Sequence, residues 1–284
     1  MGQTGCNCGQ PEFYGAGVGL NNIIKGRRVF HGTRANTIYQ FLGHKYAHAD
    51  KWKFMNYGFA YHDPNDQPIL YPADEADRFS IHLYHIVASQ LDLTGKCVID
   101  VGSGRGGGAS YVQRYLGPKT TTGLDLASSA VAFCRRVYAP VPGLFYQVGD
   151  AMNLPLADAS VDAVLNVESA HCYPDKAAFL AEALRVLRPG GSLLLADFSR
   201  RNQPMDDLID RAGFAEIVAT DITANITRGL LTDDARRREF IRDHVPFGFR
   251  RAVQAWAAAP GSWIFDDFKN GRRCYVVYRA TKAG

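Results

Sequence analysis

Residues 98–110 (VIDVGSGRGGGAS) limit the fold more than any other part of the chain, because a short apolar run with an internal acid leads directly into glycines. This order predicts a buried strand, a tight turn and the start of a helix. Gly102, Gly104 and Gly107 have the spacing G-x-G-x-x-G, which lets a ligand approach the backbone at a helix N-terminus. The segment therefore predicts an α/β domain with a ligand site after this strand.

Asp100 lies inside the predicted strand, just before Gly102, and its charge distinguishes between two ligands of such a loop. A carboxylate in this place repels the diphosphate of a dinucleotide and attracts a cation. S-adenosylmethionine (SAM) carries a sulfonium and an ammonium group and has no phosphate. The acid therefore favours SAM over NAD, whereas the glycine spacing alone fits both.

Acids also end the next two predicted strands, as a SAM site in this kind of sheet requires. Asp125 ends a strand at residues 121–126, where a carboxylate accepts hydrogen bonds from both ribose hydroxyls. Asp150 follows a strand at 145–148 and is placed to accept from the adenine amino group. The residues that we expect to contact the cofactor are Tyr57, Asp100, Gly102, Ser103, Gly104, Asp125, Leu126, Asp150, Ala151 and Asn166.

The rest of the core alternates between predicted strands and helices. These elements are a strand at 161–168, a helix at 176–187, a strand at 192–196, a helix at 205–212 and strands at 216–222 and 274–278. The helix at 176–187 is expected to end at the run Arg188-Pro189-Gly190-Gly191. About fifty residues, 223–273, separate the last two strands, which is too long for a passive loop. We expect two or three helices there, with aromatic side chains that form an apolar roof.

The N-terminal region is expected to lie outside this core. Residues 1–32 are rich in Gly and Asn and then turn basic, which predicts a flexible arm. That arm is a lid or an oligomer contact, or it stays disordered. The pattern is helical and aromatic from residue 33 to Phe59, and a further helix is expected at 78–90. Residues 33–92 are therefore predicted to form a helical cap.

Composition narrows the class of protein. The chain has 284 residues, 46% of them hydrophobic, which is enough for one large α/β domain with additions. Its net charge of +4 is spread along the chain, so no nucleic-acid partner is expected. Without a run of eighteen apolar residues or a secretory signal, we expect no membrane span and a cytoplasmic location. Six dispersed cysteines indicate reduced thiols, and Cys6 and Cys8 favour a disordered tail over a metal site.

The chemistry is expected on residues 166–174 (NVESAHCYP), because ligands in open α/β sheets bind beyond the carboxyl ends of the strands. Methyl transfer from a sulfonium is an in-line displacement, so an enzyme positions the nucleophile and handles one proton. His171 has a suitable unperturbed pKa, and a desolvated Glu168 can accept a proton or stabilise positive charge. The alternatives are that Glu168 caps a helix and that His171 is structural.

Taken in order, the glycine loop and the strand-end acids resemble the class I SAM-dependent methyltransferases. The resemblance implies a Rossmann-like α/β fold with a seven-stranded sheet, an N-terminal helical cap and a helical insertion before the last strand. It implies a SAM-binding core at residues 93–222, a substrate lid at 223–273, and a last strand and C-terminus at 274–284. It also implies that the Asn-Tyr-Gly turn places Tyr57 near the sulfonium, where the face of the ring attracts a cation.

Two kinds of relative imply different methyl acceptors. The run NVESAHCYPD and the aromatic insertion resemble phthiotriolone and phenolphthiotriolone dimycocerosate O-methyltransferases, which implies a hydroxyl acceptor and His171 as base. The glutamate after the fourth strand resembles sterol and prenyl-diphosphate C-methyltransferases. In that case Glu168 faces a carbocation, and arginine pairs such as Arg272-Arg273 hold a diphosphate.

We therefore expect a methyltransferase of secondary metabolism that acts on a lipophilic polyketide, lipid or terpenoid, with O-methylation favoured. No metal is expected, and a homo-oligomer would form through the N-terminal arm. A SAM-binding protein without transferase activity is the alternative from another class. The residues expected to contact the substrate are Tyr173, Trp256, Trp263 and Tyr275.

Overall fold

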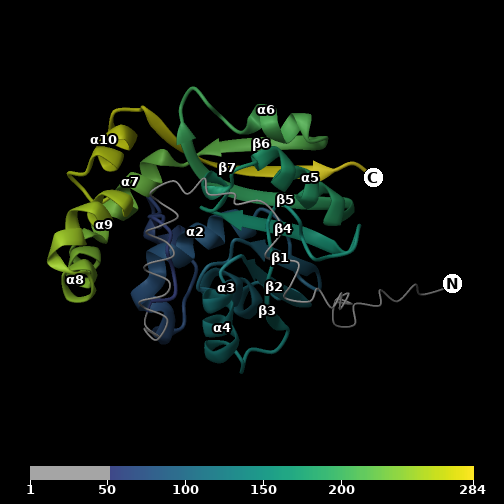
Figure 1. Ribbon diagram of the computed structural model, residues 1–284, viewed down its shortest axis with the longest axis horizontal. Helices are drawn as coiled ribbons and strands as arrows, with labels where there is room; N and C mark the ends of the chain where they lie inside the picture. The colour runs from purple at the N-terminus through teal and green to yellow at the C-terminus, as the bar shows by residue number, and fades with distance from the viewer. Residues whose placement is uncertain (1–51) are drawn as a thin grey trace, which may run out of the picture.

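A seven-stranded sheet with the order β3-β2-β1-β4-β5-β7-β6 runs through the computed structural model, which describes residues 52–284 (Figure 1). The first five strands pair in parallel, and β7 is antiparallel to both of its neighbours. Their bounds are Cys97–Val101 (β1), Thr120–Asp125 (β2), Leu144–Val148 (β3), Val161–Val167 (β4), Leu187–Arg200 (β5), Phe214–Asp221 (β6) and Arg273–Lys282 (β7). The predicted seven-stranded Rossmann-like sheet is confirmed.

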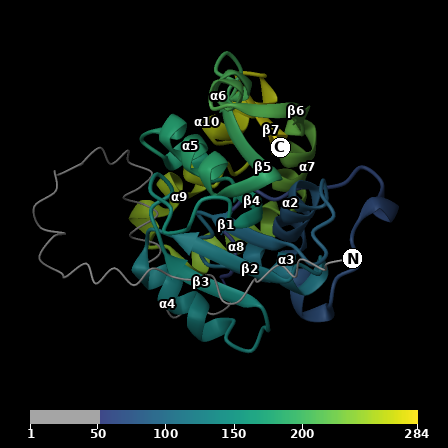
Figure 2. The ribbon, with the colours of Figure 1, turned by 90° about the vertical axis from the view of Figure 1, so that its right-hand side faces the viewer.

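Helices cover both faces of the sheet (Figures 1 and 2). On one face lie α2 (Arg78–Ala88), α3 (Gly107–Tyr115) and α7 (Thr223–Thr232), while α5 (Lys176–Val186) and α6 (Asp206–Arg211) cover the other. A further helix, α4 (Ser128–Val137), packs on β3 beside α3. Within the described residues, no helix is long and apolar enough to cross a bilayer.

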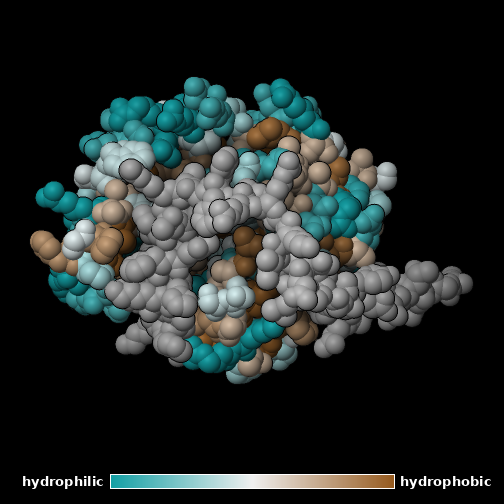
Figure 3. Space-filling model, viewed as in Figure 1, coloured by the Kyte–Doolittle hydropathy of each residue, from teal (hydrophilic) through white to brown (hydrophobic). Residues whose placement is uncertain are grey.

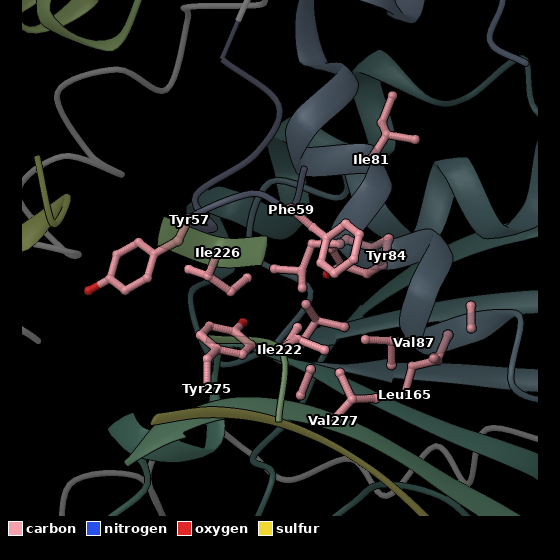
Figure 4. Packing of buried hydrophobic residues seen from close by; sticks show 14 of the residues in the cluster. Tyr57, Phe59, Ile81, Tyr84, Val87, Leu165, Ile222, Ile226, Tyr275 and Val277 are labelled. Carbon is pink, nitrogen blue, oxygen red and sulfur yellow. The ribbon is translucent and has the colours of Figure 1, made fainter. Parts of the chain in front are cut away.

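The central strand β4 shows how the sequence forms these layers. Its side chains alternate between the two faces, so that Leu165 packs with α2 and α7, whereas Val164 packs with α5. Figure 4 shows Leu165 near Val87 of α2 and Val277 of β7. Burial on both faces explains why β4 is an almost continuous apolar run in the sequence.

The insertion before β7 contains four α-helices rather than the predicted two or three. They are α7, α8 (Asp234–His244), α9 (Arg250–Trp256) and α10 (Trp263–Lys269), with a 3-10 turn, η5, at Phe247–Phe249. Pro246 lies between α8 and η5, and Pro260 lies between α9 and α10, where each interrupts helical backbone. The insertion leaves β6 at Asp221, beside the carboxyl end of β5, and therefore lies at the edge where ligands bind.

Two local predictions are wrong. Residues 52–59 form no helix, because their backbone bonds to distant elements instead: the Phe59 N–H donates to the Phe79 carbonyl at 2.8 Å. In addition, β5 begins at Leu187 and not at residue 192, since Leu187 already pairs with Val161 and the following residues form an irregularity before Ser192 pairs with Ala163. The predicted arm at 1–32, the cap up to residue 51, Cys6 and Cys8 lie outside the described residues.

Candidate active site

The glycine loop between β1 and α3 has the conformation that its sequence predicts. Gly102 and Gly104 have φ angles of 76° and 54°, in the left-handed region that favours glycine. A Cβ atom on Gly102 would lie 1.9 Å from the Ser169 hydroxyl oxygen, so a side chain cannot fit. The Gly104 N–H donates to the Asp125 carboxylate at 2.8 Å. The loop therefore holds its backbone close to Asp125, the acid that we expect to bind the ribose hydroxyls.

Asp100 lies at the carboxyl end of β1 and is fully buried. Its Oδ2 accepts a hydrogen bond from the Tyr84 hydroxyl at 3.2 Å, while Oδ1 has no hydrogen-bond partner in the described part of the chain. Burial raises the pKa of Asp100 to about 7. A buried carboxylate oxygen without a donor beside a glycine loop fits a cationic ligand such as SAM and does not fit a diphosphate.

The other predicted cofactor residues lie along the same edge. Asp125 accepts from the N–H groups of Gly104 and Ala127, which fixes its carboxylate, and burial raises its pKa. Asp150 accepts from the Met152 N–H at 2.9 Å. Three further residues that we expect to contact the cofactor differ in exposure: Ser103 is buried, Ala151 is half-buried and Leu126 is exposed.

Asn166 connects β4 to the glycine loop. Its amide nitrogen donates to the Val101 carbonyl at 2.8 Å and to the Tyr173 hydroxyl at 2.9 Å. The Tyr173 hydroxyl also lies 2.8 Å from the Ser169 hydroxyl, which is the group that fills the space beside Gly102. The structure thus places Tyr173 against the cofactor loop and away from the insertion, so its predicted contact with substrate has no geometric support.

Glu168 follows β4 with a φ angle of 52°, an uncommon conformation for a residue other than glycine. Its side chain is buried, and Oε2 accepts from the Tyr57 N–H at 2.9 Å and from the Tyr275 hydroxyl at 3.0 Å. Burial is the main cause that raises the pKa of Glu168 to about 8. Figure 4 shows Tyr57 and Tyr275 coming to this region from the loop before α2 and from β7.

His171, which is half-buried, forms a pair with the buried Asp197, a residue near the end of β5 that we did not predict. Their side chains approach to 2.9 Å between Nδ1 and Oδ1, and the His171 N–H donates to the Asp197 Oδ2 at 2.7 Å. Burial opposes the charged imidazolium, but the Asp197 carboxylate outweighs it and raises the pKa of His171 well above its usual value. An acid after a predicted strand was the signal for Asp197 that we did not use.

Phe198, also absent from our predictions, joins these groups through its ring. Its ring centre lies 4.4 Å from that of His171 and 5.3 Å from that of Tyr57, on which it stacks. The ring of Phe268 from α10 meets both Tyr57 and Phe198 edge-on. An apolar aromatic wall therefore borders the His171–Asp197 pair, with one contribution from the insertion.

The predicted substrate residues of the insertion occupy different places. The Trp256 carbonyl accepts from the Tyr57 hydroxyl at 3.2 Å, so this residue reaches the site through its backbone. Trp263 is 59% exposed, and the Arg273 guanidinium lies 5.3 Å from its ring centre. Arg237 of α8 donates to the carbonyls of Tyr57 and Ala257. The insertion therefore contacts the site mainly at Tyr57.

Comparison with known proteins is consistent with this geometry. A family model described as a methyltransferase domain matches residues 99–195. A probable phthiotriol/phenolphthiotriol dimycocerosates methyltransferase 2 of Mycobacterium ulcerans (strain Agy99) is 41% identical over 216 residues, which cover 75% of this chain and 83% of the relative. The chain belongs to the SAM-dependent methyltransferases.

Two further methyltransferases are similar to this chain, one over about half of its length and the other over most of it. A fatty-acid O-methyltransferase of Mycolicibacterium smegmatis (strain ATCC 700084 / mc(2)155) is 51% identical over 144 residues, or 51% of this chain and 52% of that protein. The crystal structure of a putative sarcosine dimethylglycine methyltransferase from Galdieria sulphuraria has a TM-score of 0.69 at 17% identity, and the match covers 86% of this chain and 98% of that one. The second likeness shows the fold.

SAM is therefore the cofactor of this methyltransferase, and when bound it supplies an electrophilic methyl group. The unsatisfied Asp100 oxygen and the left-handed glycines of the neighbouring loop are the features of this structure that fit it. Within residues 52–284, no three His, Cys, Asp or Glu side chains are grouped so that they can hold a metal ion.

Proposed function

We propose that this methyltransferase transfers a methyl group to a hydroxyl oxygen of a lipophilic lipid or polyketide in secondary metabolism. The observation that carries the proposal is the His171–Asp197 pair beside the aromatic wall of Phe198 and Tyr57. A hydroxyl must lose its proton as the new O–C bond forms. In this proposal the imidazole takes that proton, and the aromatic rings hold the apolar body of the acceptor.

Asp197 gives His171 the geometry of a general base. Because Nδ1 is engaged by the Asp197 carboxylate, Nε2 is the nitrogen that accepts the proton. The carboxylate also stabilises the imidazolium that forms, as the orienting acid of a catalytic triad does. It raises the resting pKa of His171 as well, so neutral imidazole must be generated by alkaline pH or by the nearby positive charge of the cofactor.

The names of the relatives support a lipid acceptor. The Mycobacterium ulcerans relative is named for phthiotriol and phenolphthiotriol dimycocerosates, and the Mycolicibacterium smegmatis relative for O-methylation of a fatty acid. Both kinds of molecule combine long apolar chains with an oxygen acceptor. The aromatic wall provided by Phe198, Tyr57 and Phe268 suits such an acceptor.

The second candidate is methylation of an alkene carbon, in which Glu168 stabilises the carbocation and removes a proton. The strained backbone of Glu168 and its burial favour this alternative. Because its pKa is about 8, the positive charge of the cofactor or of the carbocation must ionise Glu168 before it can act. A diphosphate on that substrate has little support, because Arg272 and Arg273 both bond to Asp267 and Arg201 bonds to Asp221.

Two substitutions distinguish the candidates. With a hydroxyl acceptor, His171→Ala should lower turnover by roughly 10²–10⁴, the usual range for loss of a general base, while SAM affinity is preserved. With an alkene acceptor, Glu168→Gln should be the crippling change and His171→Ala should be mild. Mass spectrometry of a lipid extract incubated with enzyme and methyl-labelled SAM identifies the product and its methylated atom. Turnover that survives His171→Ala but collapses in Glu168→Gln would contradict O-methylation, provided that calorimetry shows both variants still bind SAM.

A further inference from the structure

The turn between α8 and α9 presents two phenylalanines to solvent. Phe247 is 86% exposed and Phe249 is 57% exposed, and both belong to the 3-10 turn η5. We call residues 245–251 the docking tip. In Figure 3, brown apolar surface appears over the region of α9, with teal polar surface beside it.

A hydrophobic cluster lies close to these exposed rings, so a missing core is not the reason for their exposure. The insertion buries Ile241, Val245, Val253 and Ala257 in a small cluster of its own directly beside the tip. Keeping a large aromatic side chain in water forgoes the free energy that its burial would release. Exposed apolar groups of this kind on an ordered turn indicate a surface that binds a partner.

The tip also carries positive charge that no carboxylate of the described residues pairs with. The Arg250 guanidinium donates to the carbonyls of Val245 and Arg242 and lies 5.8 Å from the Phe247 ring centre. Arg251 is exposed, and neither Arg250 nor Arg251 makes an ion pair within residues 52–284. Aromatic rings next to uncompensated arginines match the boundary between the acyl chains and the anionic headgroups of a lipid bilayer.

The elements on both sides of the tip reach the candidate active site. From α8, Arg237 donates to the Tyr57 carbonyl at 3.0 Å, and from the end of α9 the Trp256 carbonyl accepts from the Tyr57 hydroxyl at 3.2 Å. Tyr57 in turn donates its N–H to Glu168. A surface bound by the tip is therefore connected through two short helices to the residues that would face the acceptor.

We propose that the docking tip inserts Phe247 and Phe249 into an anionic lipid surface, from which the enzyme takes its lipophilic acceptor. The occupant is a bilayer because the tip combines apolar rings with uncompensated positive charge, which complements anionic headgroups. This inference rests on the proposed function for the origin of the acceptor. The binding of the tip to lipid does not depend on the acceptor and is measured without it.

The test is flotation of the full-length protein with vesicles of phosphatidylcholine alone or with added phosphatidylglycerol. The wild type should float with the phosphatidylglycerol vesicles, and added salt should weaken this binding because it screens the arginines. The double variant Phe247→Ser/Phe249→Ser should partition at least ~10-fold less, the effect expected for losing two inserted rings. Arg251→Gln should weaken binding only to the anionic vesicles.

Matched variants exclude general effects of surface polarity and folding. Ile69→Ser removes an aliphatic side chain that is 94% exposed and lies outside the insertion, so it should leave vesicle binding unchanged. The conservative pair Phe247→Leu/Phe249→Leu should retain most of the binding. SAM affinity and circular dichroism should be equal in all variants, because the changed side chains are exposed and lie outside the cofactor loop.

The outcomes separate the docking surface from the proposed function. Equal flotation of the wild type and the serine double variant, or no flotation of either, would overturn the docking surface whatever the enzyme methylates. A wild-type dimer that the serine double variant dissociates in sedimentation analysis, without vesicle binding, would assign the tip to a second copy and also overturn it. If vesicle binding follows the variants as expected while no lipid hydroxyl is methylated, the docking surface stands and the proposed acceptor fails.

Discussion

Three titratable groups lie at or just beyond the carboxyl ends of β1 and β4: the buried Asp100 and Glu168, and the half-buried His171. Their surroundings favour different charge states. Burial pushes the pKa values of both carboxyls upward, to about 7 for Asp100 and about 8 for Glu168. The imidazole is stabilised in its charged form by Asp197. Before a cofactor binds, Glu168 is therefore largely protonated near neutral pH and Asp100 is about half protonated at pH 7. A positive ligand favours the ionised form of both groups.

Asp100→Asn tests the cationic site at its most buried residue. Because the Asp100 pKa is about 7, the affinity of the wild type for SAM should rise with pH through that value, as the carboxylate forms. The variant should bind SAM roughly 10- to 100-fold more weakly at alkaline pH, the effect of losing a hydrogen bond to a charged group, and should not show this rise. Isothermal titration calorimetry across the pH range measures both effects.

Two controls accompany that measurement. Asp207→Asn changes an exposed acid in the first turn of α6 and should leave the affinity for SAM unchanged. An analogue of SAM that lacks the amino group should lose less affinity in Asp100→Asn than SAM does, because one of the two charges is already missing. Equal losses for both ligands would assign Asp100 a purely structural role.

At the scale of the elements, the sheet could be predicted because each strand carries its own signal. The apolar runs that end in Asp100, Asp125 and Asp150 mark β1, β2 and β3 locally, and their order gives the class of fold. Contacts between distant segments carry no such signal. The pairing of His171 with Asp197 depends on the register of β4 and β5, which the sequence alone does not specify.

The helix predicted up to Phe59 is absent over residues 52–59 for the same reason: contacts with distant segments decide the conformation there. Its aromatic residues have a helical spacing, but its backbone is held by α2 and α7, as the bond from the Ala60 N–H to the Asn225 carbonyl shows. Tertiary hydrogen bonds overrode local preference there. The four helices of the insertion were under-predicted because proline turns at Pro246 and Pro260 divide a continuous pattern of aromatic and basic residues.

Arg237 is the residue through which the insertion holds this extended segment. Arg237→Met removes the two charged donors to the carbonyls of Tyr57 and Ala257 and leaves both acceptors without this partner. We expect the free energy of unfolding to fall by roughly 2–4 kcal/mol, measured by urea denaturation. The KM for the acceptor should also rise, because Tyr57 loses its support.

A matched substitution lies on the same helix. The exposed Arg242 side chain bonds to Glu239 and Asp243 at the surface, so Arg242→Met should change neither the urea midpoint nor the KM appreciably. Similar losses in both variants would mean that the α8 surface as a whole, and not the two bonds of Arg237, stabilises the insertion.

For the whole molecule, the raised pKa values predict how stability changes with pH. In the folded chain Asp100 and Glu168 hold their protons up to about pH 7 and about pH 8, whereas in the unfolded chain they lose them near their ordinary values of 3.8 and 4.5. The folded state therefore binds more protons between these limits, so the free energy of unfolding falls as pH rises through this range. His171 acts in the same direction, because its pKa is also raised on folding.

Carboxylates with lowered pKa values make the folded protein less stable at low pH. The side-chain bonds of Arg185 to Glu182 and of Arg114 and Tyr115 to Asp74 outweigh desolvation and lower both pKa values. Their contribution is present at neutral pH and is lost as pH falls through their folded-state pKa values. The cofactor-free protein should therefore be most stable in mildly acidic solution, between these two sets of titrations.

Urea unfolding of the cofactor-free protein across pH tests this expectation. The variant Glu168→Gln isolates the contribution of Glu168 to the change of stability with pH. From about pH 5 to about pH 8 the wild type should lose stability, at about 1.4 kcal/mol for each unit of pKa shift that titrates. Glutamine has almost the same shape and does not titrate, so the variant should lose less over the same range. SAM should restore more stability at pH 8 than at pH 6, because its positive charges bind the ionised form of Asp100. A wild-type stability that stays level or rises over this range would show that Asp100 and Glu168 are not held protonated in the folded protein.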